Sequence, residues 1–381
     1  MRITAAVLDR SGVSGSFAES RTLRLAELDL QPPRRGELLV RIDAAGVCHS
    51  DLSVITGDRV RPTPMALGHE AAATVLRLGE DEAGFAVGDR VVLTFLPSCG
   101  VCEDCQSGRG YLCGPGAEAN GAGRLLAGSG RLSEAGSEVF HHLGVSAFAT
   151  CAVVDRRSAV KVPSDIPPEV AALFGCAVLT GVGAVLNTAA VRPGESVAVY
   201  GLGGVGLAAV MGAVAAGAQP VIAVDPVPEK RALALALGAS LAVRPDDAAE
   251  AIAGCTRGGV EVAVETAGKA AVLAAAYEAT RRGGRTVTVG LPHPAEMLSI
   301  PAVSLAAQGK ALLGSYMGSS IPSRDIPRYI ALWRAGRLPV ERLLSATGPL
   351  SEVNRFMDEL ASGRAVRQIL FPQACAEGSG H

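Results

Sequence analysis

The sequence has few of the features that mark nucleic-acid-binding or membrane-surface proteins. Its 35 Lys and Arg residues are balanced by 37 Asp and Glu residues, so the formal net charge is −2 at pH 7. It contains no basic run and no aromatic-rich basic face, and the charge pattern therefore favours neither a nucleic acid nor an anionic membrane as a partner. The amino-terminal stretch lacks the long apolar segment of a secretory signal, so we expect a cytoplasmic protein.

Charged residues are also scarce, at 19%, whereas hydrophobic residues make up 49% of the 381 residues. This balance excludes a disordered chain. Domains typically hold about 100–200 residues, so the length predicts two domains. A nearly uncharged run, 196–225, is long enough to cross a membrane, but it contains six glycines and an internal Gln-Pro pair. We interpret it as a buried strand–turn–helix–strand unit.

The amino-terminal part of the chain has the texture of a β domain. Up to about residue 177, short apolar runs such as 37–47 alternate with Gly and Pro turns, which predicts an irregular, barrel-like arrangement of strands. The glycine-rich stretch 114–140 is expected to form a long surface loop. His141 and His142, which follow it, are expected to be solvated.

From 195 onward, strand and helix patterns alternate, which is typical of a doubly wound parallel sheet. A glycine-rich loop there follows an apolar strand and opens a helix, as in sites where backbone must approach a pyrophosphate. The next strand ends at Asp225, whose carboxylate can bind both ribose hydroxyls of NAD and would repel the 2′-phosphate of NADP. The pattern predicts an NAD(H) site, with simple helix packing as the alternative for the glycines. The loop consists of Gly201, Leu202, Gly203, Gly204, Val205 and Gly206.

Four of the nine cysteines are crowded into one short segment. The odd total in a chain of this length favours metal binding in a reducing compartment over a disulfide framework. Four thiolates suit a closed, structural zinc site. An iron–sulfur cluster is the alternative, but the spacing of the fourth cysteine does not fit the ferredoxin runs. The four residues are Cys99, Cys102, Cys105 and Cys113.

Three further metal-ligand candidates are scattered along the chain. Cys48 follows the apolar run 37–47, His69 lies in a Gly-His-Glu triplet, and Cys176 precedes an apolar helical segment. A Cys/His/Cys set leaves one position of a tetrahedral zinc open, as a catalytic site requires. Taken singly, Cys176 could equally be a buried small hydrophobe and His69 a core histidine. Spacing alone does not bring the three together.

In combination, these motifs resemble the zinc-dependent alcohol dehydrogenases of the medium-chain dehydrogenase/reductase family. The resemblance rests on GVCHSD, GHE, the four-cysteine lobe, GCAVLTG and the glycine loop with its Asp, and it spans essentially the whole chain. It implies an α/β-plus-β fold, in which a GroES-like catalytic domain is interrupted by a Rossmann domain. The implied segments are a catalytic domain (1–177) with a structural zinc lobe (about 97–115), the Rossmann domain (178–320) and a return to the catalytic domain (321–381).

The resemblance also implies chemistry. Each chain would bind two zinc ions, one catalytic and one structural, together with NAD(H). The implied reaction is the reversible oxidation of a primary or secondary alcohol, in which hydride passes from a zinc-bound alkoxide to the nicotinamide. The expected partner is a small alcohol or aldehyde.

The roles of individual residues are carried over from the same resemblance. Cys48, His69 and Cys176 would bind the catalytic zinc. Ser50 would accept the substrate proton, and Asp51 would hydrogen-bond His69 and fix its tautomer. Further positions carried over are Glu70 behind the zinc, Thr180 and Val205 beside the nicotinamide, Lys230 beside the adenosine ribose, and Arg367 on the pyrophosphate.

Several positions depart from the family pattern. Liver-type enzymes carry an arginine after the first zinc cysteine, where this chain has His49, which would make a weaker or pH-dependent pyrophosphate contact. Their proton relay ends on a histidine at the position of Ser53, which is no base near pH 7, so water or His49 would take that role. Glutathione-dependent formaldehyde dehydrogenases use an acidic and a basic residue where this chain has Arg59 and Ala117, so a glutathione adduct is disfavoured as the substrate.

Substrate type and oligomeric state are also implied by the resemblance. Six residues fall where the family lines its substrate pocket, and they favour an apolar or aromatic alcohol or aldehyde, with core packing as the alternative for each. The long gap between Cys113 and Cys176 resembles that of the dimeric branch, so we expect a homodimer. The six residues are Phe95, Leu96, Leu143, Phe148, Leu291 and Tyr316.

Other functions stay open at this point. A zinc-free quinone or enoyl reductase of the same superfamily would lack both cysteine sets, which this chain has. A formaldehyde dehydrogenase acting on a thiol adduct and a zinc-stabilised NAD-binding protein without dehydrogenase activity are the remaining alternatives. The number of zinc ions per chain separates a catalyst with two from a scaffold with one.

Overall fold

The computed structural model describes residues 1–80 and 83–372, which form two compact units. The first unit contains Met1–Cys176, Ile321–Ile326 and the chain from Leu344 onward, and the second contains Ala177–Ser320 and Pro327–Leu343. The sequence prediction placed all of 321–381 with the first domain, so the structure differs in grouping 327–343 with the second. Residues 373–381 of that predicted segment lie outside the described residues.

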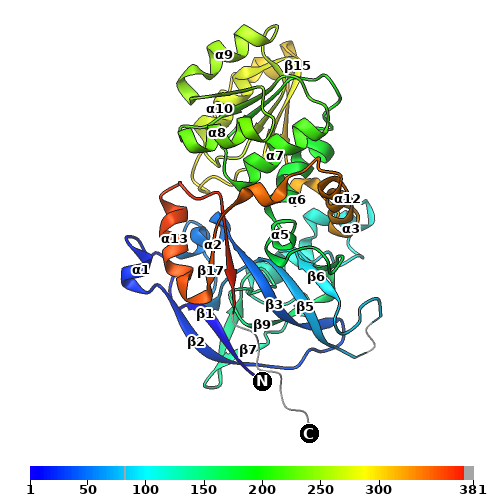
Figure 1. The fold of residues 1–381 in the computed structure, drawn as a ribbon, viewed down its shortest axis with the longest axis vertical. Helices are drawn as coiled ribbons and strands as arrows, with labels where there is room; N and C mark the ends of the chain where they lie inside the picture. Colours follow the sequence, from blue (N-terminus) through cyan, green and yellow to red (C-terminus); the bar gives the residue numbers. More distant parts are fainter. Residues whose placement is uncertain (81–82, 373–381) are drawn as a thin grey trace. The chain divides into compact units, whose positions relative to one another are not determined.

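The first unit is mainly β structure (Figure 1). Its strands are β1 (Arg2–Leu8), β2 (Leu23–Leu30), β3 (Glu37–Val47), β4 (Met65–Ala66), β5 (Glu70–Leu78), β6 (Arg90–Leu93), β7 (Leu132–Glu134), β8 (Ser137–His141), β9 (Cys151–Asp155), β10 (Ala159–Lys161), β17 (Leu344–Pro349) and β18 (Arg367–Phe371). Strands β1, β2, β7, β8 and β4 close a barrel. The others form a sheet in the order β10–β6–β5–β3–β18–β17, with β9 also paired to β3. The predicted barrel-like β domain is therefore confirmed.

Strand β3 shows how the sequence specifies this unit. Leu38, Val40 and Ile42 are spaced two residues apart, so their side chains point to the same face of the sheet, where they lie in the main core. The strand pairs with β5, β9 and β18, and its carboxyl end leads directly to Cys48. The candidate metal ligand is thus delivered from the most extensively paired strand of the sheet.

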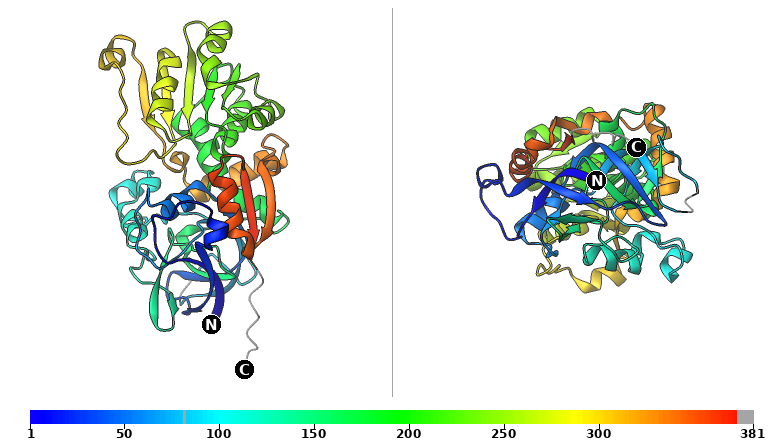
Figure 2. Two further views of the ribbon diagram at one scale, coloured as in Figure 1. Left: turned by 90° about the vertical axis from the view of Figure 1, so that its left-hand side faces the viewer. Right: turned by 90° about the horizontal axis from the view of Figure 1, so that it is seen from below.

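Short helices surround the β structure of this unit. They are α1 (Phe17–Ser20), α2 (His49–Thr56), α3 (Glu103–Gln106), α4 (Gly114–Gly121), α5 (Pro168–Leu173) and α13 (Val353–Ala361). Helices from opposite ends of the chain meet here, because Asp358 of α13 accepts hydrogen bonds from the amides of Phe17 and Ala18 at 2.7 and 3.0 Å. Figure 2 shows α13, in orange-red, next to the blue amino-terminal segment.

The prediction of a long loop over 114–140 is wrong. Helix α4 occupies its start, and β7 and β8 pair as an antiparallel hairpin that helps to close the barrel. The glycines form tight turns between these elements, such as Gly136 with a φ of 84° between the two strands. The solvated position expected for His141 and His142 is also wrong, since each is only 1% exposed.

A buried ion pair ties this hairpin to the sheet. The guanidinium of Arg131 donates to both carboxylate oxygens of Glu37 at 2.7 and 2.8 Å, and both side chains are 1% exposed. The backbone amide of Arg131 donates to Nε2 of His141 at 3.0 Å. The pair is bidentate, which is the geometry in which a guanidinium and a carboxylate satisfy each other best when buried. It therefore fixes the position of the chain just before His142.

The second unit is an α/β structure with one parallel sheet. Its strands are β11 (Val197–Tyr200), β12 (Val221–Val224), β13 (Leu241–Val243), β14 (Val260–Glu265), β15 (Thr280–Thr288) and β16 (Ala311–Gly314). Its helices are α6 (Ala177–Gly183), α7 (Gly204–Ala215), α8 (Pro228–Ala236), α9 (Ala248–Cys255), α10 (Ala270–Ala279) and α11 (Ala302–Ala307). Helix α12 (Pro322–Arg334) is shared between the two units.

The sheet order confirms the predicted doubly wound fold. Strands follow in the order β13–β12–β11–β14–β15–β16, and every neighbouring pair is parallel. The chain therefore builds outward from β11 in both directions, so the strand order reverses between β11 and β14. Such a reversal opens a crevice at the carboxyl ends of the strands, where dinucleotides bind. None of the helices in the described residues is both long and apolar enough to cross a membrane.

Candidate metal centres and cofactor site

The four-cysteine lobe has the geometry of a closed metal site. All four sulfur atoms lie within 4.8 Å of one another, and two pairs are 4.0 Å apart. A tetrahedral zinc with bonds of about 2.3 Å separates its sulfur ligands by about 3.8 Å, so the cysteines fit one ion. An iron–sulfur cluster would spread its cysteines over several iron atoms. The sulfur atoms belong to Cys99, Cys102, Cys105 and Cys113.

Backbone amides in this lobe donate hydrogen bonds to cysteine sulfur atoms and so stabilise their thiolate form. The amide of Cys99 points to the sulfur of Cys113 at 3.2 Å, and that of Cys102 points to the sulfur of Cys99 at 3.3 Å. Amide donors from Val101 and Cys102 lower the pKa of the Cys99 thiol below its ordinary value. Four protein ligands fill a tetrahedral zinc ion and leave no open position for a substrate, so the arrangement matches a structural role.

A second cluster brings together residues that are far apart in the sequence. Cys48 precedes α2, His69 lies just before β5, which begins at Glu70, and Cys176 lies just before α6. One ligand atom from each lies within 4.8 Å of the others, and all four residues are buried. The structure thus assembles the Cys/His/Cys set that sequence spacing could not, and it adds Glu70 to the same cluster.

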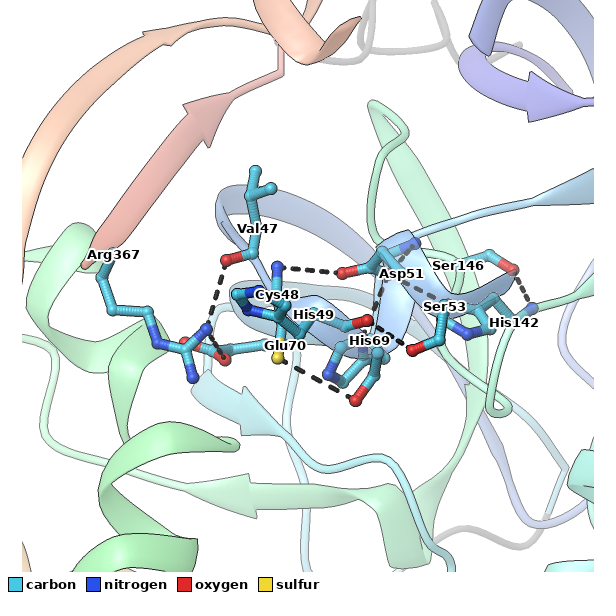
Figure 3. A network of polar contacts seen from close by, with 12 residues as sticks. Val47, Cys48, His49, Asp51, Ser53, His69, Glu70, His142, Ser146 and Arg367 are labelled. Atoms are coloured by element: carbon cyan, nitrogen blue, oxygen red, sulfur yellow. Dashed lines mark hydrogen bonds and ion pairs between the residues drawn. The ribbon is translucent and has the colours of Figure 1, made fainter. Parts of the chain in front are cut away.

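The orientation of His69 is set by Asp51 (Figure 3). The Nδ1 atom of His69 lies 3.1 Å from Oδ1 of Asp51, whereas its Nε2 is buried and has no hydrogen-bond partner. An ionised carboxylate can only accept, so Nδ1 carries a proton, and Nε2 is the nitrogen left for a metal, which would displace any proton on it. A buried imidazole nitrogen without a partner, facing two cysteine sulfurs, is what a zinc ligand requires. The residues present therefore fit a bound zinc ion.

The charges of the cluster also favour a cation. A hydrogen bond from Cys176 lowers the pKa of Cys48 well below its usual value, helped by the charges of Arg367 and His69. The same bond, together with burial, raises the pKa of the Cys176 thiol. Burial alone would lower the pKa of His69, but Asp51 outweighs it and raises that pKa well above 6.5. Cys48 is thus the more acidic of the two thiols, and a dication that binds both sulfur atoms would displace their protons.

Glu70 and Arg367 face each other behind the cysteines. Burial raises the pKa of Glu70 to about 7, against the opposing charge of Arg367. The guanidinium of Arg367 donates to the carbonyl of Val47 at 3.2 Å and lies 3.9 Å from Oε2 of Glu70. Both carboxylate oxygens of Glu70 and Nε of Arg367 are buried without a hydrogen-bond partner. These atoms are free to bind a ligand, and the predicted roles of Glu70 and Arg367 stay predictions.

The residues around Cys48 are only partly arranged as the predicted proton relay needs. Ser50 Oγ lies 3.9 Å from the sulfur of Cys48, beside the candidate metal position. Ser53 Oγ donates to the carbonyl of His49 at 2.6 Å, so its proton is engaged within helix α2. His49 is exposed on the first turn of that helix. The predicted roles of Ser50 and His49 stay predictions.

The predicted pocket residues are divided between the two units. Phe95 contacts His69 edge-to-face, with ring centroids 5.7 Å apart, and it is joined in the first unit by Leu96, Leu143 and Phe148. These four side chains are buried. Leu291 and Tyr316 belong to the second unit, and Leu291 is 60% exposed.

His142, which was expected in solvent, is buried and belongs to the site. Its Nδ1 lies 3.1 Å from Oδ1 of Asp51, and its ring meets that of His69 edge-to-face at 5.5 Å. The apolar residues on both sides of the His141–His142 pair were the one signal of burial, because solvated histidines seldom interrupt a hydrophobic run.

The glycine loop of the second unit lies where β11 meets α7. Gly201 adopts a φ of 88°, and Gly203 caps the amino end of α7. A Cβ atom on Gly206 would lie 1.8 Å from the carbonyl of Gly201, so no larger residue fits, whereas nothing lies within 4 Å of a Cβ on Gly203. The loop is therefore closed on its inner side and open at Gly203, where a pyrophosphate could approach the backbone.

Three other predicted cofactor residues belong to the same unit. Asp225 follows β12 and accepts hydrogen bonds from the amides of Leu202 and Val227 at 2.7 and 2.8 Å. A carboxylate has lone pairs left for ribose hydroxyls after these two bonds. Lys230 lies on α8, and Thr180 on α6 has a buried hydroxyl without a hydrogen-bond partner. This unpartnered hydroxyl and the open glycine backbone fit a bound dinucleotide.

Comparisons with known proteins agree with these sites. Residues 34–164 match the model of the alcohol dehydrogenase GroES-like domain, and residues 204–334 match that of the zinc-binding dehydrogenase family. The chain is 34% identical over 367 residues to an S-(hydroxymethyl)glutathione dehydrogenase of Escherichia coli O1:K1, covering 95% of this chain and 99% of that protein.

Two solved structures are also similar over nearly their whole length. One is an alcohol dehydrogenase zinc-binding domain protein from Burkholderia ambifaria, with 36% identity, a TM-score of 0.91 and coverage of 97% of this chain and 99% of that one. The other is benzyl alcohol dehydrogenase from Acinetobacter calcoaceticus, with 31% identity, a TM-score of 0.91 and coverage of 98% and 99%. With both metal clusters and both domain types in place, the chain belongs to the zinc-dependent alcohol dehydrogenase family.

Proposed function

We propose that this enzyme oxidises an apolar or aromatic primary alcohol to its aldehyde, reversibly, with NAD as the hydride acceptor. The observation that carries the proposal is the buried set of Cys48, His69 and Cys176, in which the free Nε2 of His69 faces the two sulfurs. Three protein ligands leave one position for substrate. A zinc ion held there supplies a Lewis acid, which lowers the pKa of an alcohol and promotes hydride loss to the nicotinamide.

The side chains around these ligands have separate tasks in this proposal. Asp51 keeps the proton of His69 on Nδ1, so that Nε2 faces the metal. Ser50, whose hydroxyl lies 3.9 Å from the sulfur of Cys48, receives the proton of the alcohol. Because Ser53 donates to the carbonyl of His49, the proton leaves Ser50 through water rather than along the helix.

The substrate class is inferred from the predicted pocket residues of the first unit. Phe95 lies against His69, and Leu96 and Leu143 are apolar and largely buried. An apolar lining binds a hydrocarbon or aromatic group and offers no partner to charged groups. The similar benzyl alcohol dehydrogenase supports this choice. The curated relatives named S-(hydroxymethyl)glutathione dehydrogenase make the thiol adduct of formaldehyde the second candidate.

We also propose a homodimeric, cytoplasmic enzyme. Strand β16 lies at the edge of the parallel sheet, and an unpaired edge can pair with a second copy. The segment just before β16 exposes apolar side chains, and exposed apolar patches are often covered by a partner protein. Both zinc sites need thiolates, which persist in a reducing compartment. The exposed side chains are Leu291, Met297, Val303 and Leu305.

The first prediction concerns metal content. The wild-type protein should contain about two zinc ions per chain, and His69→Ala should keep one and remain folded. Losing the Lewis acid should lower kcat/KM for the alcohol by about 10³-fold or more, since such an acid contributes several kcal/mol. Metal analysis and steady-state kinetics measure both effects. Cys255→Ser, at an exposed cysteine, is the control, and full turnover by the one-zinc His69 variant would contradict the proposal.

The second prediction concerns the choice between NAD and NADP. Asp225→Gly removes the negative charge that would face a 2′-phosphate, so the ratio of kcat/KM for NAD over NADP should fall by about 10–100-fold, or about 1.4–2.7 kcal/mol. Asp225→Asn, which removes the charge but keeps an acceptor for the amide of Leu202, should lower the ratio in the same direction. An unchanged ratio in both variants would refute the assigned role.

The third prediction separates the two substrate candidates. With NAD in excess, kcat/KM for benzyl alcohol should exceed that for ethanol by about 10-fold or more, because each buried methylene equivalent contributes about 0.8 kcal/mol. S-(hydroxymethyl)glutathione should be a poorer substrate than benzyl alcohol. A higher kcat/KM for the glutathione adduct than for any simple alcohol would favour the second candidate instead.

The fourth prediction concerns assembly. Light scattering coupled to size-exclusion chromatography should give twice the chain mass of 38.7 kDa. Val303→Glu, at a side chain that is 72% exposed, should shift the protein toward monomer because it would bury a charge in the interface. Val87→Glu, at a 66% exposed valine of the first unit, is the matched control and should leave the mass unchanged. A monomeric wild type would contradict the proposed dimer.

A further inference from the structure

A strained turn delivers His142 to the metal cluster. Leu143 and Ser146 both adopt positive φ angles, of 51° and 54°, which is uncommon for residues other than glycine. The turn is held by bonds from the amide of His142 to the hydroxyl of Ser146 at 3.0 Å, and from the amide of Val145 to the carbonyl of His142 at 3.0 Å. Backbone strain of this kind persists only where surrounding contacts require it.

The same turn is joined to the segment that carries His69. The amide of Ala147 donates to the carbonyl of Gly68 at 3.0 Å, and a Cβ on Gly68 would lie 2.4 Å from the backbone nitrogen of Phe148. Gly68 can adopt its φ of 93° and this close approach because it has no side chain. The two histidines are therefore held against one another by their backbones, as their edge-to-face contact reflects.

Both imidazoles meet one oxygen of Asp51. Its Oδ1 lies 3.1 Å from the amide nitrogen of Gly68, 3.1 Å from Nδ1 of His69 and 3.1 Å from Nδ1 of His142. A carboxylate oxygen has two lone pairs, so three nitrogens crowd it. His142 accordingly makes a short contact without the alignment of a good hydrogen bond, and its Nδ1 has no other partner. Figure 3 shows Asp51 between the two rings.

His142 is not needed to hold Asp51 in place. The other oxygen, Oδ2, accepts from the amide of Cys48 at 3.1 Å, and Gly68 holds Oδ1, so two backbone amides already fix the carboxylate. What His142 adds is a polar nitrogen at the oxygen that His69 uses. The positive end of the His142 N–H dipole faces Oδ1 of Asp51 and reduces the negative charge that this oxygen offers to His69. Carboxylate partners normally raise the basicity of a metal-bound histidine, so His142 opposes that effect.

We propose that His142 is a positioning residue that weakens the Asp51–His69 hydrogen bond and thereby makes His69 a weaker donor to the catalytic zinc. A zinc ion bound by this weaker donor would keep more positive charge for the substrate oxygen. The protein would hold that zinc ion less tightly. The inference rests on the proposed zinc site and names a residue that sets how tightly this site holds zinc.

The test measures metal release and metal environment in the zinc-loaded full chain. In His142→Phe, zinc should transfer from the catalytic site to a chromogenic chelator about 10-fold more slowly than in wild type, because Asp51 then supports His69 alone. The phase that is absent in His69→Ala identifies the catalytic site. With Co²⁺ in that site, the ligand-field absorption bands of His142→Phe should shift from those of wild type, and kcat should fall.

Two matched variants separate this role from simple packing. His142→Gln keeps an N–H donor near Asp51 and should restore release and spectrum toward wild type. His141→Phe alters the neighbouring histidine, which is equally buried but accepts from the amide of Arg131 instead. It should lower stability while leaving both metal readouts unchanged. If His142→Phe does not fold, His142→Leu makes the same comparison.

The outcomes are distinct. Wild-type release and spectrum in His142→Phe, faster release, or equal changes in His141→Phe would each overturn the inference while the zinc assignment stands. A wild-type protein with no release phase that depends on His69 would instead refute the proposed function.

Discussion

The ligands of the candidate catalytic metal come from three separate segments, and the carboxylate of Asp51 joins two of them. One oxygen accepts from the amide of Cys48, and the other accepts from Gly68 and from the ring of His69. Burial would raise the pKa of this carboxyl, but the two neighbouring histidines hold it at about 2, so it stays ionised. A fixed negative charge in a buried site orients His69 and favours a cation beside it.

The two units supply the remaining requirements by different physical means. In the first, a barrel and a sheet bring distant segments together, and the buried Glu37–Arg131 pair secures the hairpin that ends next to His142. In the second, the parallel sheet places the carboxyl ends of all its strands at the same edge. The glycine loop leaves backbone open to a phosphate. The four-cysteine lobe adds rigidity without chemistry.

The sequence predicted the fold class and the glycine loop because both depend on local pattern. The alternation after residue 195 and the strand–loop–helix around Gly203 are short-range signals. The candidate catalytic ligands could be proposed only through family resemblance, because Cys48 and Cys176 are brought together by packing that sequence spacing does not reveal. His142 and the Glu37–Arg131 pair were missed, since a buried polar group is recognisable only with its distant partner. The stretch 114–140 was misread because its glycines form turns between regular elements.

The most direct test of this account is zinc K-edge X-ray absorption of the purified enzyme. A Cys₄ lobe and a Cys/His/Cys site together predict an average of about three sulfur atoms near 2.3 Å and one nitrogen or oxygen near 2.0–2.1 Å per zinc. An average of four sulfur atoms, with no nitrogen or oxygen, would mean that only the lobe binds metal. That result would contradict a catalytic zinc held by Cys48, His69 and Cys176.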